Sequence, residues 1–280
     1  MKSSGPAAAG LAVLGLIAAA VALGGALLPH GPFEIDLSRA LRSPSFDHPF
    51  GTDAFGRDVL ARVLHGGRVS LAVGFAARSI SLVLGLLAGT AAGYIGGRTD
   101  ALVMRLADVT FAFPTLLLLI AIMAVVTPGA GALCVALGVV GWAAMARLVR
   151  GQVLAVRGRE FVQAARAAGA GHLRIIGRYI LPQCVSPLVV VFALGLGMTI
   201  TAEASLSFLG LGVQPPAPSW GGMISAGIPF MRTAPWLTVF PGLVLTATIC
   251  ALNLAGGGLR DALDPRAGSA AARGSRASRN

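Results

Sequence analysis

The chain has 280 residues, of which 55% are hydrophobic and 12% are charged, and its formal net charge is +11. A soluble domain usually carries about 25% charged residues, so this composition excludes an ordinary soluble protein and favours one that lies in a lipid bilayer. Lys2 is the only lysine, which excludes the phosphate-binding motif GxxxxGK[ST] and an ATPase site of that kind. Most arginines lie between apolar runs, so the positive charge indicates membrane topology and anionic lipid headgroups rather than nucleic acid.

Six apolar stretches are long enough to cross about 30 Å of hydrocarbon, which takes roughly 20 helical residues. In chain order they are Leu11–Leu28, Val73–Ile95, Val109–Val126, Gly131–Leu148, Pro187–Phe208 and Leu237–Leu259. The first exceeds the usual apolar core of a signal peptide and no A-x-A cleavage site follows it, so it is expected to be an uncleaved span. The sequence therefore predicts an all-α membrane protein with six transmembrane helices.

The basic residues predict how these spans are oriented. With the N-terminus in the cytoplasm, the inner segments hold more than twice as many Lys and Arg residues as the outer segments. Because these residues favour the cytoplasmic side, we expect both termini to be cytoplasmic. The chain then divides into an N-terminal span with an external segment (1–72), a core of five spans (73–260) that includes a cytoplasmic segment (149–186), and a cytoplasmic tail, partly disordered (261–280).

The cytoplasmic segment between the fourth and fifth spans has internal helical periodicity. A strong helix-forming run covers Glu160–Ala168, and Gly169-Ala170-Gly171 breaks it. A second helix is expected over His172–Ile180, with Leu173, Ile176 and Ile180 on one apolar face. Leu181-Pro182 is expected to stop this helix before the fifth span. From the residues alone, the segment is either an amphipathic hairpin lying on anionic lipid or a docking element for a soluble partner.

The external segment and the loop after the fifth span carry turn residues, charges and aromatic residues. Asp53 or Asp58 is expected to pair with Arg57 or Arg62 in a compact turn, which lowers the cost of charge near the membrane. In the loop over residues 209–236, Trp220 and Trp236 fit interfacial anchors. Met223, Phe230 and Met231 are candidates to face an incoming substrate or a docked binding protein.

Three ionisable residues fall in or beside predicted spans. Glu203 lies inside the fifth span, where a carboxylate costs several kcal/mol unless it is paired or hydrated. It is either hydrogen-bonded to a neighbour, such as Thr201 or Ser205, or part of a translocation cavity. Arg78 in the second span is expected to extend its side chain toward the outer interface, and Asp108 is expected to cap the helix of the third span.

The run EFVQAARAAGAGHLRIIGRYILP at residues 160–182 resembles the EAA loop of bacterial ABC importer permeases. In that family the loop forms a coupling helix that docks on the ATP-hydrolysing subunit. The matching positions in this chain are Glu160, Ala164, Ala165, Gly169 and Pro182. The resemblance therefore favours the docking element over the lipid-bound hairpin.

Further motifs resemble the second permease subunit of the dipeptide, oligopeptide and nickel importers. They are GTDAFGRDVLARVLHGGRVSL at 51–71, DVTFAFP at 108–114, SFLGLGV at 207–213, PSWG at 218–221 and GLRDALDP at 258–265. The resemblance spans roughly residues 35–266. Gly257 is a departure, because the family usually has Asp before the Gly-Leu-Arg-Asp motif.

The resemblance implies a six-span permease of the type I ABC importer kind in the bacterial inner membrane. Its implied partners are a homologous permease, two ATP-binding subunits and an extracytoplasmic solute-binding protein. The chain is expected to bind no cofactor or metal and to have no catalytic residue, with ATP and magnesium held by the partner ATPase subunits. A secondary transporter is disfavoured because no internal repeat is evident, and a membrane enzyme because the four histidines form no ligand set.

The expected cargo is a peptide, and the alternative is nickel or another small solute. A metal path favours His or Met clusters, whereas the fifth span offers Met198 and Glu203 without a nearby His. The sequence therefore predicts a peptide importer subunit, with Glu203 as the candidate for the translocation path.

Overall fold

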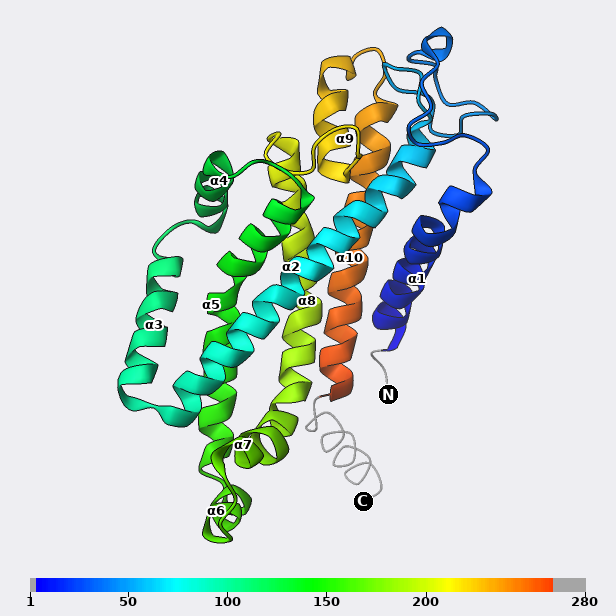
Figure 1. Cartoon of the computed structure of the whole chain (residues 1–280). Helices are drawn as coiled ribbons and strands as arrows, with labels where there is room; N and C mark the ends of the chain where they lie inside the picture. The colour runs from blue at the N-terminus through cyan, green and yellow to red at the C-terminus, as the bar shows by residue number, and fades with distance from the viewer. Residues whose placement is uncertain (1–3, 264–280) are drawn as a thin grey trace, which may run out of the picture.

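The computed structural model describes residues 4–263, which form a bundle of long helices (Figure 1). The helices are α1 (Ser4–Leu27), α2 (Val59–Ile95), α3 (Gly97–Phe111), α4 (Thr115–Val125), α5 (Ala130–Arg157), α6 (Glu160–Ala167), α7 (His172–Ile175), α8 (Leu181–Phe208), α9 (Trp220–Gly227) and α10 (Trp236–Leu263). Shorter turns are η1 (Leu37–Arg39), the π-helical η2 (Ile176–Ile180) and η3 (Ile228–Phe230). Within this range the chain forms no β-strand, and Thr52 and Asp58 make an isolated bridge. The predicted tail lies outside the described residues from position 264 onward.

The number of spans reaches the predicted six when α3 and α4 are counted as one broken span. Five continuous helical segments are long and apolar enough to cross a bilayer, and the pair of α3 and α4 passes the same test with a bend of 88°. The prediction of one helix over Val109–Val126 was therefore wrong. Pro114 stands at the bend, where its ring removes a backbone N–H and disfavours helical geometry at the residue before it. The all-α, six-span fold class is confirmed with this correction.

Helix α2 begins at Val59 rather than at the predicted Val73. Asp58 caps it by accepting a hydrogen bond from the backbone N–H of Ala61 at 2.8 Å. The polar residues of this first part find partners: the guanidinium of Arg68 donates to the carbonyl oxygens of Val21 and Ala22, near the end of α1, at 2.6 and 2.7 Å. Because the carbonyl oxygens of α1 bind the charge of Arg68, this charge does not interrupt α2. Helix α2 therefore continues through a region that hydropathy alone places outside the span.

Helices α2 and α5 pack along a stripe of small residues. Gly85, Gly89 and Gly93 recur every four residues on α2, which places them on one face. A Cβ atom added to Gly89 would lie 2.5 Å from the carbonyl oxygen of Ala146 and 2.7 Å from the Cβ of Val149. The backbones therefore approach more closely than a larger side chain allows, as is typical of helices packed in a membrane. Around this pair, α8 and α10 complete the bundle and α1 packs against α10 (Figure 1).

The chain passes from the segment after α5 into α8 without a stop at Leu181-Pro182, so that prediction was wrong. Residues 172–208 form one continuous helical segment. In η2 the N–H of Leu181 donates to the carbonyl of Ile176, five residues earlier. This wider turn changes the register just before Pro182, whose ring would clash with the preceding turn of a regular α-helix.

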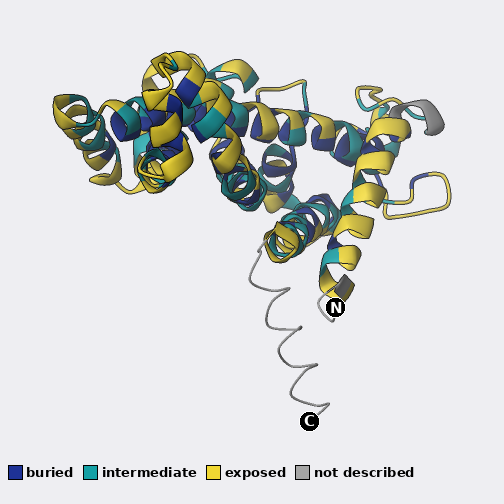
Figure 2. Cartoon of the chain, turned by 90° about the horizontal axis from the view of Figure 1, so that it is seen from below, coloured by how far each residue is buried: buried dark blue, intermediate teal, exposed yellow. Residues whose placement is uncertain are grey.

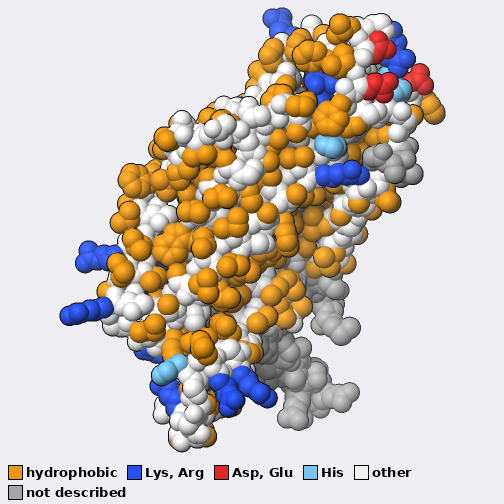
Figure 3. All heavy atoms as spheres, viewed as in Figure 1, with side chains coloured by type: hydrophobic (Ala, Val, Ile, Leu, Met, Phe, Trp, Pro, Cys, Tyr) orange, Lys and Arg blue, Asp and Glu red, His pale blue; other side chains and the backbone are white. Residues whose placement is uncertain are grey.

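The surface has the polarity of a membrane protein. Hydrophobic side chains cover the middle of the molecule. Acidic side chains gather with some arginines near the segment before α2, whereas the opposite end shows arginines and no acidic side chains (Figure 3). Exposed residues lie mostly on the outer faces of the helices, and buried residues face the neighbouring helices (Figure 2). The first turn of α1 and the last turn of α10 lie at the same end of the bundle as α6 and α7 (Figure 1). The described ends of the chain are therefore on the same side as the segment between α5 and α8.

Candidate functional site

The segment that joins α5 to α8 begins with the predicted short helix. Helix α6 covers Glu160–Ala167, as expected, and Gly169 follows it with φ of +80°. The N–H of Ala170 donates to the carbonyl of Ala165 at 3.0 Å, and the N–H of Gly169 donates to the carbonyl of Arg166 at 2.9 Å. This pair of bonds is the Schellman motif. Gly169 is required there because its left-handed backbone costs a side-chain-bearing residue free energy.

The five residues that match the EAA loop differ in their exposure. Ala165 is buried, whereas Glu160, Ala164, Gly169 and Pro182 are exposed. The buried face of the segment packs against the end of α5, in a cluster that contains Val153, Val156, Val162 and Ile175. The segment thus has one face fixed to the bundle and one face free in this chain.

The second helix presents a different face from the one predicted. Leu173 is 87% exposed, whereas Ile175 and Ile180 are buried. Because α7 lasts only four residues before the π turn of η2, the regular 3.6-residue spacing used for the prediction does not hold. Leu173 and Phe161 are both exposed on this segment, which is a feature of a contact surface rather than of a core.

Two contacts that the sequence did not predict attach this segment to the end of α2. The hydroxyl of Tyr94 lies 2.9 Å from Nδ1 of His172, and the guanidinium of Arg166 lies 5.5 Å from the centre of the Tyr94 ring. Nearby, Arg157 donates to the carbonyl of Gly93 at 2.7 Å. The loop between α5 and α8 is therefore connected to α2 as well as to its own neighbours in sequence.

Ion pairs hold α3 against α5. The guanidinium of Arg150 makes two bonds to the carboxylate of Asp100, at 2.5 and 2.6 Å. Asp108 lies in the last turn of α3 and pairs with Arg147, so the prediction that it caps a helix N-terminus was wrong. The misplaced boundary has the same cause as the broken third span: the helix ends after Phe111 instead of beginning near Val109.

Glu203 on α8 is completely buried. Its Oε1 accepts a hydrogen bond from the hydroxyl of Ser207 at 2.8 Å, whereas its Oε2 has no partner among the described residues. Thr201 and Ser205 were expected as its partners, but their hydroxyls donate to the carbonyls one turn back along α8. The partner is instead one turn further on, where the side chain of Ser207 lies on the same face.

Arg78 is also buried, which contradicts the expectation that it extends to the outer interface. It is 9% exposed, and its Nη2 donates to the carbonyl oxygen of Val191 on α8 at 2.7 Å. Gly195 lies against the guanidinium, and a Cβ atom there would overlap it. The glycine on α8 thus provides the space that keeps this arginine between α2 and α8.

The external segment contains a compact turn built around Asp53. Its Oδ1 accepts from the backbone N–H groups of Phe55 and Arg57 at 2.8 and 3.0 Å. Its Oδ2 lies 2.7 Å from Nε of Arg57 and 3.5 Å from Nε of Arg62. The predicted pairing is therefore right for Asp53. Asp58 differs, because it pairs with Nδ1 of His48 at 2.8 Å while it caps α2.

The two tryptophans were expected to be interfacial anchors, and Trp220 does not have that position. It is fully buried and its indole N–H donates to the carbonyl of Val63 at 2.9 Å. Trp236 is partly buried and donates to the carbonyl of Thr52 at 3.2 Å, which fixes α10 to the external segment. Both rings use their N–H to satisfy backbone groups of another element.

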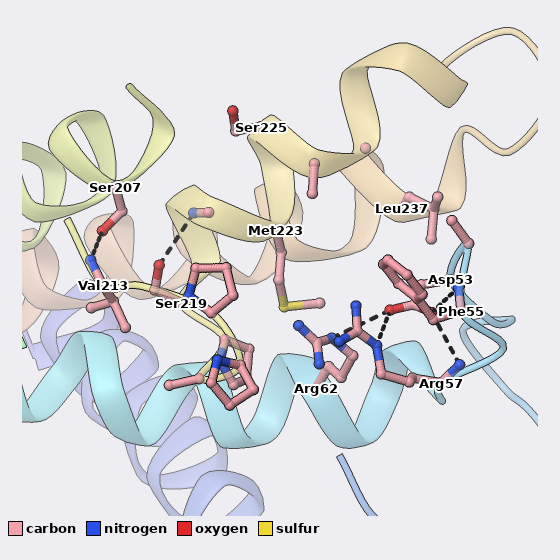
Figure 4. Close-up of a pocket in the computed structure, with 18 of the residues that line it drawn as sticks. Asp53, Phe55, Arg57, Arg62, Ser207, Val213, Ser219, Met223, Ser225 and Leu237 are labelled. Atoms are coloured by element: carbon pink, nitrogen blue, oxygen red, sulfur yellow. Dashed lines mark hydrogen bonds and ion pairs between the residues drawn. The ribbon is translucent and has the colours of Figure 1, made fainter. Parts of the chain in front are cut away.

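A cavity of about 690 Å³ lies between α9, the start of α2 and the loop after α8 (Figure 4). Met223 and Phe230, which were candidates to face a substrate, line it; Met231 is exposed and lies outside the lining. Arg57 and Arg62 lie at one side of the cavity with Asp53 (Figure 4). Among residues 4–263, no group of three or more His, Cys, Asp or Glu side chains is placed to hold a metal ion.

The fold is that of known importer permeases. A solved structure described as inward-facing conformations of the MetNI methionine ABC transporter superposes with a TM-score of 0.59 at 20% identity, covering 72% of this chain and 96% of that chain. Another, described as an amino acid ABC transporter with histidines, has a TM-score of 0.53 at 17% identity and covers 73% and 93%. Together with the six spans, this likeness defines a multi-pass membrane protein with the architecture of an ABC importer permease.

The profile of the family described as "Binding-protein-dependent transport system inner membrane component" matches residues 81–269. The dipeptide transport system permease protein DppC of Bacillus subtilis is 42% identical over 95% of this chain and 83% of its own length. The glutathione transport system permease protein GsiD of Pectobacterium atrosepticum is 44% identical over 92% and 86%. The chain belongs to this family of inner-membrane permeases, and the resemblance noted in its sequence motifs is confirmed.

Proposed function

We propose that this chain forms the translocation path of an ATP-driven peptide importer together with a second, homologous permease. The observation that carries the proposal is the identity of 42 to 44% with permeases of dipeptide and glutathione transport systems over more than nine-tenths of the chain. The protein would reside in the bacterial cytoplasmic membrane with both termini in the cytoplasm. The gathering of arginines at the end that holds α6 and α7 supports this orientation (Figure 3).

The exposed face of the segment 149–186 is the proposed docking surface for an ATP-binding subunit. Glu160, Ala164, Gly169 and Pro182 lie on the exposed side, and Ala165 holds the segment to the bundle from the buried side. ATP and magnesium would be held by two partner ATPase subunits, and this chain would contribute no ATPase site of its own. A subunit without a nucleotide site has to receive its conformational change through contact, and the bonds to α2 and the continuous helix into α8 supply the route.

Glu203 is the proposed residue of the translocation path. The lack of a partner for its Oε2 supports this role, because a buried carboxylate oxygen can accept a donor from a neighbouring helix or a passing solute. An extracytoplasmic solute-binding protein would deliver the cargo to the opposite end of the bundle, where the cavity lies.

The test is ATP-dependent uptake in proteoliposomes that hold this chain with its partner permease, the ATPase subunits and the binding protein. Labelled di- and oligopeptides are compared with nickel. Ala164→Glu places a charge on the exposed docking face without disturbing the core, and Ala40→Glu, at an exposed alanine of the segment before α2, is the control away from that face. We expect Ala164→Glu to reduce peptide uptake by about tenfold or more, because an unpaired charge buried in an interface costs upwards of 1–3 kcal/mol, while the control retains uptake.

Each outcome bears on a separate part of the proposal. Nickel uptake without peptide uptake would refute the peptide cargo and retain the architecture. Full uptake by Ala164→Glu would refute the docking surface. Transport by the permeases in the absence of the ATPase subunits would refute the importer class.

A further inference from the structure

The cavity beside α9 carries an uncompensated positive charge. Its charged lining residues are Asp53, Arg57 and Arg62. Two guanidinium groups therefore face one carboxylate. Both oxygens of that carboxylate already accept hydrogen bonds from Arg57 or the backbone of the turn, and one of them also forms an ion pair with Arg62. Arg62 is 9% exposed and its Nη1 donates to the carbonyl of Pro32 at 3.0 Å. The site holds one cation more than it holds anions.

Arg57 is the group with unused hydrogen-bonding capacity. Its Nε is bound to Asp53 at 2.7 Å, whereas its two terminal nitrogens make no hydrogen bond to the part of the chain that the structure describes. The guanidinium lies over the Phe55 ring, 4.7 Å from its centre, in a cation–π contact. A planar guanidinium with free terminal N–H groups is suited to bind a carboxylate.

The rest of the lining is apolar with hydrogen-bonding groups at a distance from the arginines. Figure 4 shows Met223 extending toward the two arginines, with Ser219 and Ser207 on the far side and Ser225 on α9 above. Phe230 and Leu237 add apolar wall. A volume of about 690 Å³ falls in the usual range of small-molecule sites. The cavity thus offers a cationic end, an apolar middle and hydroxyl groups beyond it.

We propose that this cavity is a binding site for the terminal carboxylate of a short peptide, with Arg57 as the residue that holds it. The proposal rests on the proposed function, because it assigns to the imported peptide a resting place within this subunit. The carboxylate binds the terminal nitrogens of Arg57, and the backbone of the peptide extends over Met223 toward the hydroxyl of Ser219. Peptides with a free C-terminus bind better than peptides in which that group is blocked.

The test measures protection from labelling at the wall of the cavity. Ala226→Cys is introduced at an exposed residue of α9 that lines the cavity, and the complex of both permeases with the ATPase subunits is placed in nanodiscs without the binding protein. Modification of position 226 by a charged methanethiosulfonate reagent is followed by mass spectrometry, so the native cysteines need not be removed. The probes are trialanine with a free carboxylate and trialanine amide, at up to millimolar concentration.

We expect trialanine to slow modification of position 226. The amide, or Arg57→Gln, raises the half-protecting concentration about tenfold, as expected for the loss of one charge-assisted hydrogen bond. Arg57→Lys restores part of the protection. Arg232→Gln is the control, because Arg232 is an exposed arginine in the loop between η3 and α10 that does not line the cavity. An unchanged rate of modification without peptide shows that Arg57→Gln leaves the cavity intact.

The outcomes separate this site from the function on which it rests. Equal protection by trialanine and its amide would overturn the assignment of the carboxylate to Arg57. Absence of protection, with peptide uptake intact in proteoliposomes that contain the binding protein, would overturn the site and leave the proposed function standing. Protection without any peptide uptake would support the site and refute the proposed function.

Discussion

Replacement of Gly89 by alanine tests the close approach of α2 and α5. The added Cβ would lie 2.5 Å from the carbonyl oxygen of Ala146 and 3.1 Å from its Cα. Ordinary contacts between carbon atoms are about 3.5–4.0 Å, and backbone atoms do not rotate away as a side chain does. The helices must therefore separate, at a cost of about 1–3 kcal/mol for an overpacked site.

The expected net effect includes a gain that opposes this cost. Alanine is better than glycine inside a helix by about 0.8–1.0 kcal/mol, so Gly89→Ala is expected to lower the free energy of unfolding by about 1 kcal/mol. Gly151→Ala is the matched control, because Gly151 lies in the partner helix α5 and a Cβ there meets no atom within 4 Å. That variant receives the helix gain alone and is expected to be more stable than the wild type.

The assay is unfolding of the purified permease complex in mixed detergent micelles by titration with dodecyl sulfate, followed by circular dichroism. The two variants are predicted to shift the midpoint in opposite directions. If Gly89→Ala is as stable as Gly151→Ala, the backbones of α2 and α5 are further apart than described, and the argument from the glycine stripe fails.

Two further predictions concern polar groups at the ends and in the middle of the helices. Asp58→Ala removes the cap of α2 and the partner of His48, so it should lower the free energy of unfolding by about 1 kcal/mol or more in the same titration. The control is Asp47→Ala, at an exposed aspartate of the same segment, which should change the free energy of unfolding little. Glu203→Gln retains an oxygen that accepts from Ser207 but removes the charge, so complex assembly should remain intact by size-exclusion chromatography while the rate of peptide uptake changes. Unchanged uptake would remove Glu203 from the path.

Hydropathy was sufficient to predict the number of spans but not where the helices begin and end. Val59–Ala72 was placed outside the membrane helix because it contains charged residues, yet the cap at Asp58 and the bonds of Arg68 to α1 allow the helix to continue. The break at Pro114 was missed because the apolar composition continues across it. In both cases local geometry and contacts with distant elements decided the structure.

The segment between α5 and α8 was likewise predicted only where its structure depends on neighbouring residues in the sequence. The helix at Glu160–Ala167 and the turn at Gly169 follow from local preference, so the sequence predicted them correctly. The exposure of Leu173 depends on the π turn, and the attachment of His172 to Tyr94 joins residues far apart in sequence. The cavity could not be predicted at all, because Arg57, Ser207 and Met223 come from three separate segments that only the folded bundle brings together.

Helix α2 is long enough to connect the cavity with the segment between α5 and α8. Its 37 residues span about 55 Å at 1.5 Å per residue, well beyond the thickness of the hydrocarbon core. Arg62 near its first turn lines the cavity, and Tyr94 near its last turn contacts His172 in the segment between α5 and α8. As a rigid rod that pivots at its middle, α2 would move each end by roughly 5 Å, one helical turn, for a tilt of about 10°. A push received at the end that holds Tyr94 would thus reappear as a displacement of the cavity wall in the opposite direction.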